Sequence, residues 1–151
     1  MIIFKYFIDS NEVRTYPNLD SFPEDVFYNG AVTVDILILY RSYCIYIQDS
    51  ILAFCINALG ELRELNSNPD YVGGMVNMDG KYGLRFHRQG TDLVIKHDGV
   101  FKVYPFQEFY EGLKKFIKKV LSDLEVYYPN IVFSSGYQNI KLRLNIWINQ
   151  K

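Results

Sequence analysis

The clearest hydrophobic pattern in the chain runs from Phe106 to Tyr128. Its apolar residues recur at three- and four-residue spacing, which places them on one face of a helix. This face comprises Phe109, Tyr110, Leu113, Phe116, Ile117, Val120, Leu121 and Leu124, whereas Lys114, Lys115, Lys118 and Lys119 fall on the opposite side. The segment is therefore predicted to be an amphipathic helix that packs on a sheet. Its lysine face is interpreted as solvated, with a docking patch for an acidic partner as the alternative.

A second helix is predicted over residues 51–65, where apolar positions form a wider face. These positions are Ile51, Leu52, Phe54, Cys55, Ala58, Leu59, Leu62 and Leu65. Asp49-Ser50 provides an N-cap signal before this helix. Asn66 to Asp70, which includes Pro69, ends it because Pro and Asx residues favour turns. A single short helical turn is also predicted at residues 23–26, since Pro is tolerated at a helix start.

The remaining patterned segments are predicted to be strands. Residues 2–8 alternate loosely, and in residues 32–40 Val32, Val34, Ile36, Ile38 and Tyr40 share one face, whereas Thr33 and Asp35 share the other. Turn signals at Asp79-Gly80, Gln89-Gly90 and Asp98-Gly99 separate four further strands, at 74–78, 81–88, 91–97 and 100–104. A last strand is predicted from Lys141 to Ile148, where apolar and polar residues alternate.

This order of elements predicts an α+β fold in one domain, residues 1–151. The expected architecture is a largely antiparallel sheet, with the meander in the middle of the chain and two main helices packed on one face. A chain of 151 residues matches the usual size of one domain, and no repeat or low-complexity segment divides it.

Charge and hydropathy exclude several classes of partner. A net charge of −1 provides no general basic field for nucleic acid, so no nucleic-acid partner is expected. No apolar run reaches the roughly 20 residues of a membrane span, and the N-terminal segment lacks signal-peptide features. No membrane partner is expected, and a cytoplasmic location is predicted. Cys44 and Cys55 are interpreted as free thiols in apolar surroundings, although the sequence does not fix the distance between them.

Candidate catalytic groups are sparse in the sequence. The two histidines, His87 and His97, lie in neighbouring strands, where the hairpin is expected to place His87 near Asp92 and away from His97. Ser134-Ser135-Gly136 lacks the nucleophile-elbow frame and is interpreted as a turn. We therefore predict no catalytic residue, no cofactor and no metal site, and we expect a protein without enzymatic activity.

The chain is similar to the small immunity proteins of bacterial contact-dependent and polymorphic toxin systems. The resemblance lies in residues 51–62, in Gly83-Leu84-Arg85-Phe86 and Asp92-Leu93-Val94-Ile95 of the meander, and in residues 104–109 leading into the long helix. It covers most of the chain, without a diagnostic motif. It implies a cytoplasmic, non-enzymatic protein that binds one cognate protein toxin tightly, often over the toxin's active site.

An acidic patch is a candidate for the partner-binding surface. Glu61, Glu64, Asp70 and Asp79 are predicted to lie near the junction of the first long helix and the meander. If the toxin is a nuclease with a basic cleft, such a patch would steer the two proteins together.

Two other functions remain open at this stage. The chain is alternatively a homo-oligomeric binding or assembly module that joins through an edge strand or Trp147. The other alternative is a small enzyme whose site assembles from scattered residues such as His87 and Asp92. The sequence does not fix the oligomeric state, the toxin or the surface that binds it.

Overall fold

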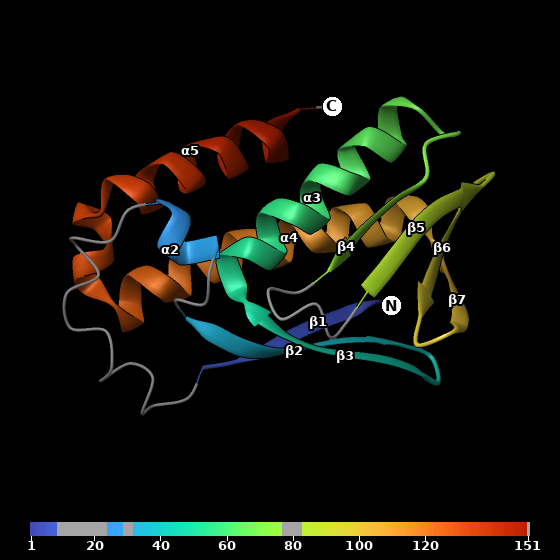
Figure 1. Cartoon of the computed structure of the whole chain (residues 1–151), viewed down its shortest axis with the longest axis horizontal. Coiled ribbons are helices and arrows are strands. Elements are labelled where there is room, and N and C mark those ends of the chain that lie inside the picture. Colours follow the sequence, from blue (N-terminus) through green and yellow to red (C-terminus); the bar gives the residue numbers. More distant parts are fainter. Residues whose placement is uncertain (9–23, 29–31, 77–82, 151) are drawn as a thin grey trace.

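The computed structural model describes residues 1–8, 24–28, 32–76 and 83–150. Within these ranges the chain is an α+β protein with two antiparallel sheets and three long helices, which confirms the predicted fold class. Figure 1 shows the three-stranded sheet along the bottom of the view and the four-stranded sheet at its right, with the helices above and behind them. Helix α3 (Ile51–Ser67) and helix α4 (Phe106–Tyr127) contact strands of both sheets.

The first sheet has the strand order β1-β2-β3, formed by Ile3–Phe7, Thr33–Tyr40 and Tyr43–Ser50. Alternate residues of β2 point inward, so that Val34, Ile36 and Ile38 are buried in the core. A two-residue turn at Arg41 and Ser42 joins β2 to β3, and Arg41 has a φ of 55°. The chain passes from β3 directly into a helix at Ile51.

The second sheet is the predicted meander, with the order β4-β5-β6-β7. Its strands are Gly73–Val76, Gly83–Gln89, Asp92–His97 and Val100–Pro105. Asp98 and Gly99 have φ values of 51° and 74°, which is the left-handed pair that a tight hairpin requires and that explains the Asp-Gly sequence. The predicted turn at Asp79-Gly80 lies outside the described residues.

Two helices follow the predicted amphipathic patterns closely. Helix α3 spans Ile51–Ser67 and helix α4 spans Phe106–Tyr127, and both bury their apolar faces against the sheets. The short helix α2, Glu24–Tyr28, lies beside them, where the sequence predicts a helical turn. Lys114 departs from the predicted solvated lysine face: its side chain is buried with its amine 4.1 Å from the centre of the Tyr110 ring. Lys115, Lys118 and Lys119 are exposed, as predicted.

The predicted last strand, Lys141–Ile148, is wrong. This segment belongs to helix α5, Ser135–Asn149, which follows the 3-10 helix η2, Pro129–Phe133. Tyr137, Ile140, Leu144 and Ile148 form its buried face at helical spacing. Leu142 and Ile146, which complete the alternation of a strand, point into solvent. The hydroxyl of Ser134 accepts a hydrogen bond from the Tyr137 N–H at 3.0 Å and caps the helix, so the predicted turn at Ser134-Ser135-Gly136 is a helix start.

The strands form two sheets, where one was expected, and there are three main helices, where two were expected. Helices α3 and α4 contact the sheets, whereas α5 packs against α2, α3 and α4. Helix α3 separates β3 from β4 in the chain. The two sheets meet at an aromatic cluster of Tyr40, Tyr43 and Tyr104. Close by, the Lys102 amine donates a hydrogen bond to the Cys44 carbonyl at 2.7 Å and links β7 to β3.

Tyrosine–carboxylate hydrogen bonds fasten the helices to the rest of the fold. The Tyr137 hydroxyl on α5 donates to Glu125 of α4 at 2.9 Å, and Lys141 donates to the same carboxylate. The Tyr6 hydroxyl on β1 donates to Asp123 of α4 at 2.6 Å. Burial raises the pKa of both tyrosines, and the neighbouring carboxylates raise it further, so both hydroxyls stay protonated and serve as donors.

None of the helices in the described ranges has the length and apolar character needed to cross a bilayer. Cys44 is exposed on β3, contrary to the apolar surroundings expected for it, whereas Cys55 is buried in α3. Both thiols are free, which agrees with the prediction from the sequence. Burial raises the pKa of the Cys55 thiol, which therefore remains protonated and unreactive.

Candidate protein-binding surface

Three of the four predicted acidic residues lie at the junction between helix α3 and the meander. Glu61 and Glu64 lie one turn apart in the last part of α3, and Asp70 lies in the connection from α3 to β4. Glu64 and Asp70 are exposed, so their charges face solvent. Asp79 lies outside the described residues. The junction of helix and meander is therefore acidic at the three positions that the structure describes.

Glu61 differs from the other acidic residues because it has a structural partner. Its carboxylate accepts a hydrogen bond from the Tyr71 hydroxyl at 2.8 Å, and this bond raises the pKa of that tyrosine. Gly73 makes room for the pair: a Cβ at this position would contact the Glu61 carboxylate and lie 2.6 Å from the Tyr71 ring. The Gly73-Gly74 pair is therefore required by close packing at the start of β4, and Glu61 anchors the connection.

The histidines stand apart, as the sequence predicts, but in a different register. His87 of β5 lies opposite Val94, and His97 of β6 lies opposite Leu84. Asp92 pairs with Gln89, so the expected direct pairing of His87 with Asp92 is wrong, and Asp92 is a diagonal neighbour of His87 on the same face. The error is in the turn, which is centred on Gly90 and Thr91, one residue later than predicted. Within the described ranges, no three His, Cys, Asp or Glu side chains group closely enough to hold a metal ion.

The outer face of the three-stranded sheet carries a patch of apolar side chains that the sequence interpretation missed. Residues paired across β1, β2 and β3 lie on the same face, and the pairing places Ile3 beside Leu39 and Cys44, and Lys5 beside Leu37 and Tyr46. Phe7 lies in the next row, beside Asp35 and Gln48. We call Ile3, Phe7, Leu37, Leu39, Cys44 and Tyr46 the outer apolar face.

The exposure of this face is substantial. Ile3, Phe7 and Tyr46 are 41%, 55% and 42% exposed. Proteins seldom leave several large apolar side chains together in water unless the patch binds a partner. The signal in the sequence was the run Ile36 to Tyr40 in β2, which is apolar at every position. Such a run is typical of a strand covered on both faces, whereas a strand with one solvated face alternates.

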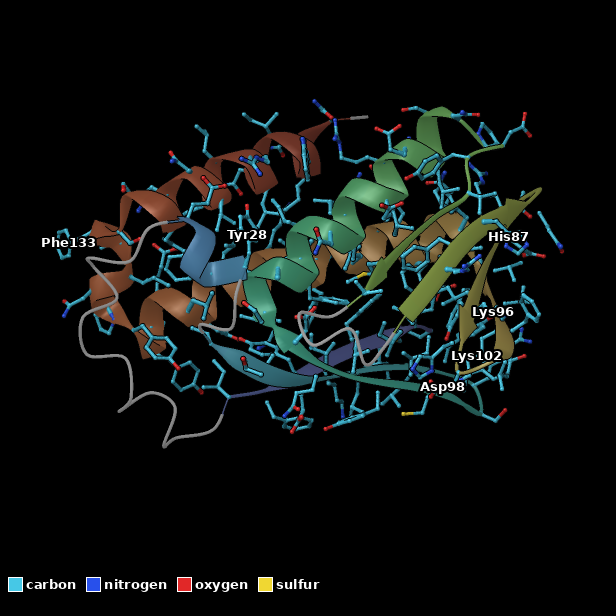
Figure 2. All side chains as sticks on the ribbon, in the orientation of Figure 1. Tyr28, His87, Lys96, Asp98, Lys102 and Phe133 are labelled. Carbon is cyan, nitrogen blue, oxygen red and sulfur yellow. The ribbon has the colours of Figure 1, made fainter. Side chains whose placement is uncertain are left out.

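The outer face of the meander has a different character. Arg85 of β5 lies directly opposite Lys96 of β6, and Lys96 lies opposite Phe101 of β7, with its amine 5.5 Å from the centre of that ring. Figure 2 shows Lys96 and His87 on the meander, at the opposite end of the molecule from Phe133. A directly opposed pair of like charges is mildly destabilising. This face therefore combines two basic side chains with the exposed apolar side chains of Phe101 and Val103.

Trp147, an anchor considered for an oligomer, is partly buried. The guanidinium of Arg63 stacks on its indole ring at 4.4 Å from the ring centre, and the ring also lies 3.6 Å from the position of a Cβ on Gly60. Arg63 in turn donates to the Gln150 side chain at 2.6 Å. Trp147 therefore packs α5 onto α3, which removes it as an exposed anchor.

Comparison with protein families, with curated proteins and with solved structures found no match.

Proposed function

We propose that this chain is a non-enzymatic protein-binding domain, and specifically an immunity protein that binds and neutralises a cognate bacterial toxin domain. The outer apolar face is the observation that carries the proposal. It combines large exposed apolar and aromatic side chains with a rigid antiparallel sheet, and both features are typical of the centre of a protein–protein interface. The sequence resemblance to immunity proteins supports the choice of a toxin as partner.

The acidic residues at the end of α3 have a secondary role in this proposal. Glu64 and Asp70 are exposed and free to attract a basic toxin, which accelerates encounter more than it adds affinity. Glu61 contributes its charge but is fixed by Tyr71. Tight binding is assigned to the apolar face and steering to the acidic residues.

The test begins with the gene next to the one that encodes this chain. A large open reading frame with a variable C-terminal domain supplies the toxin domain, whereas a metabolic operon argues against the proposal. The toxin domain is expressed in a bacterium with and without this chain. The proposal predicts growth only when the chain is present, and equal growth arrest in both strains contradicts it.

A pair of matched variants tests which surface acts. Phe7→Lys places a charge in the outer apolar face, and Phe133→Lys makes the same change in η2, where the phenylalanine is 74% exposed. Loss of an aromatic residue from an interface centre weakens binding by about tenfold or more. Phe7→Lys is therefore expected to weaken protection and Phe133→Lys to preserve it, with circular dichroism confirming that both variants fold. The reverse result would move the interface to the α4–α5 end of the molecule.

A further inference from the structure

A groove runs between the edge strand β1 and helix α4. Its lining includes Phe4 of β1 and Gly112, Lys115 and Phe116 of α4, and its volume is about 450 Å3. The two elements are fastened together at both ends. The Ile2 N–H donates to Glu108 at 3.1 Å, and the Tyr6 hydroxyl donates to Asp123 at 2.6 Å. Helix α4 therefore follows β1 along its length, with its N-terminal end beside Ile2.

The hairpin that joins β2 to β3 determines which residues of β1 direct their backbone N–H and C=O groups toward β2. A two-residue turn between Tyr40 and Tyr43 makes these residues a hydrogen-bonded pair, so the even-numbered residues of β2 bond to β3. The odd-numbered residues of β2 consequently bond to β1, where their partners are Ile3, Lys5 and Phe7. The N–H and C=O groups of Phe4 and Tyr6 then point away from the sheet, along its free edge.

The contact between Ile2 and Glu108 independently supports this assignment, in which the backbone groups of even-numbered residues of β1 point away from β2. Ile2 has the same parity as Phe4 and Tyr6, and its N–H points to α4. Within the part of the chain that the structure describes, no element pairs with this side of β1, which is an edge of its sheet. An edge strand with free N–H and C=O groups is a template for a further strand.

The walls of the groove suit an extended chain. Gly112 has no side chain, and a Cβ there would lie 3.1 Å from the Phe4 ring, so a larger residue would crowd this part of the groove. The ring of Phe4 packs edge-on against Phe109, 5.1 Å away, and its other neighbour, Phe116, forms part of the apolar lining. An extended segment of about four residues, at about 3.3 Å per residue, spans the distance from Ile2 to Tyr6.

The charges along the groove are separated by sign. Glu108 and Glu111 line it beside the start of β1, whereas Lys115 and Lys119 line it further along. The Lys119 amine forms an ion pair with the Asp123 carboxylate at 2.6 Å. Lys115, by contrast, is exposed and forms no ion pair among the described residues. An acidic side chain on the occupant therefore finds an available cation at Lys115.

We propose that this groove binds an extended segment of the partner protein, which adds to β1 as a fourth strand and places an acidic side chain at Lys115. The proposal rests on the proposed function, because the segment belongs to the toxin domain. The segment's backbone pairs with Phe4 and Tyr6, and an apolar side chain lies against the partly exposed ring of Phe4. An extended strand is the occupant because a helix has no free backbone groups to offer the edge.

Amide hydrogen exchange of the free chain gives the first test. The amides of Phe4 and Tyr6 are expected to exchange without protection, whereas those of Lys5 and Phe7 are protected by β2. Protection of Phe4 and Tyr6 in the free monomer would overturn the proposal, because the edge would already be used. Protection that arises with concentration, together with dimer sedimentation, would assign the groove to a second copy and would also overturn it.

The same measurement in the complex with the toxin domain gives the decisive test. Phe4 and Tyr6 are expected to become protected, and Lys115→Glu is expected to weaken binding by about tenfold, because it replaces an attraction with a repulsion. Lys118→Glu, the same change at an exposed lysine outside the groove, leaves the affinity unchanged. Tight binding without new protection would overturn the strand addition and leave the proposed function intact. Absence of binding and of neutralisation would remove both proposals.

Discussion

The hydroxyl of Tyr137 lies 2.9 Å from the carboxylate of Glu125, whereas the equally buried hydroxyl of Tyr104 has no hydrogen-bond partner among the residues that the structure describes. The two tyrosines are both fully buried, yet they differ in whether the hydroxyl is satisfied. Because an unsatisfied buried hydroxyl is costly and a satisfied one is favourable, the same substitution should act oppositely at the two sites.

We predict that Tyr137→Phe lowers the free energy of unfolding by about 1 to 2 kcal/mol, since it removes a hydrogen bond to a charged group. Tyr104→Phe is the matched control and is expected to leave stability unchanged or to raise it. Urea denaturation of both variants measures the difference. An equal loss at both positions would show that the hydroxyl of Tyr104 is satisfied in solution.

Acid should weaken the attachment of α5 to α4. The hydrogen bond from Lys141, aided by the one from Tyr137, lowers the pKa of Glu125 below its usual 4.5 despite the opposing effect of burial. A carboxylate with a depressed folded-state pKa contributes stability above its unfolded pKa and loses that contribution as pH falls through the folded one. Stability is therefore expected to decline below about pH 4.5, and Glu125→Gln should flatten this part of the pH profile. An unchanged profile in that variant would assign the acid sensitivity to other carboxylates.

The start of β4 should be intolerant of even a methyl group. Gly73→Ala places a Cβ against Tyr71 and the Glu61 carboxylate, and it is expected to destabilise the fold by about 1 to 3 kcal/mol through crowding. Gly83→Ala is the control, because the nearest atom to its Cβ is a Val76 methyl carbon at 3.9 Å. Thermal denaturation compares the two. A Gly73→Ala variant as stable as Gly83→Ala would show that the Tyr71–Glu61 contact yields easily.

The acidic residues at the end of α3 should affect the rate of association. Glu64→Gln combined with Asp70→Asn removes two exposed negative charges. Among the described residues, neither carboxylate forms a hydrogen bond or an ion pair, so the double variant breaks no such contact. If these charges steer a basic toxin, the association rate falls several-fold at low salt and little at high salt. Stopped-flow mixing with the toxin domain measures both conditions. Equal rates for the variant and the original chain at low salt would exclude a steering role.

The sequence predicts the parts of the fold that depend on local pattern. The helix from Phe106 and the Asp98-Gly99 turn follow from spacing and from turn geometry that a few neighbouring residues determine. The prediction failed at residues 141–148 because Leu142 and Ile146 complete a strand-like alternation, although they are solvent-facing residues of a helix. Only the packing of Ile140, Leu144 and Ile148 against the core distinguishes the two interpretations.

The candidate surface was predictable only in part. Local sequence indicates that Glu61 and Glu64 lie near the meander, but the bond between Glu61 and Tyr71 depends on how β4 returns along α3. The outer apolar face and the β1–α4 groove combine residues more than 30 positions apart in the chain, such as Ile3 and Leu39 of the outer apolar face. The apolar run from Ile36 to Tyr40 indicates a strand that is apolar on both faces, but which residues of β1 and β3 lie beside it is a tertiary relationship that no local pattern reveals.

Titration of the purified toxin domain with this chain tests the central claim most directly. The residual activity of the toxin is measured as the chain is added, with the Phe7→Lys variant in parallel. The account predicts a stoichiometric fall of activity to zero, with a dissociation constant of about 1 nM or tighter, equivalent to roughly −12 kcal/mol, and weaker inhibition by the variant. Full toxin activity in the presence of excess chain would contradict it.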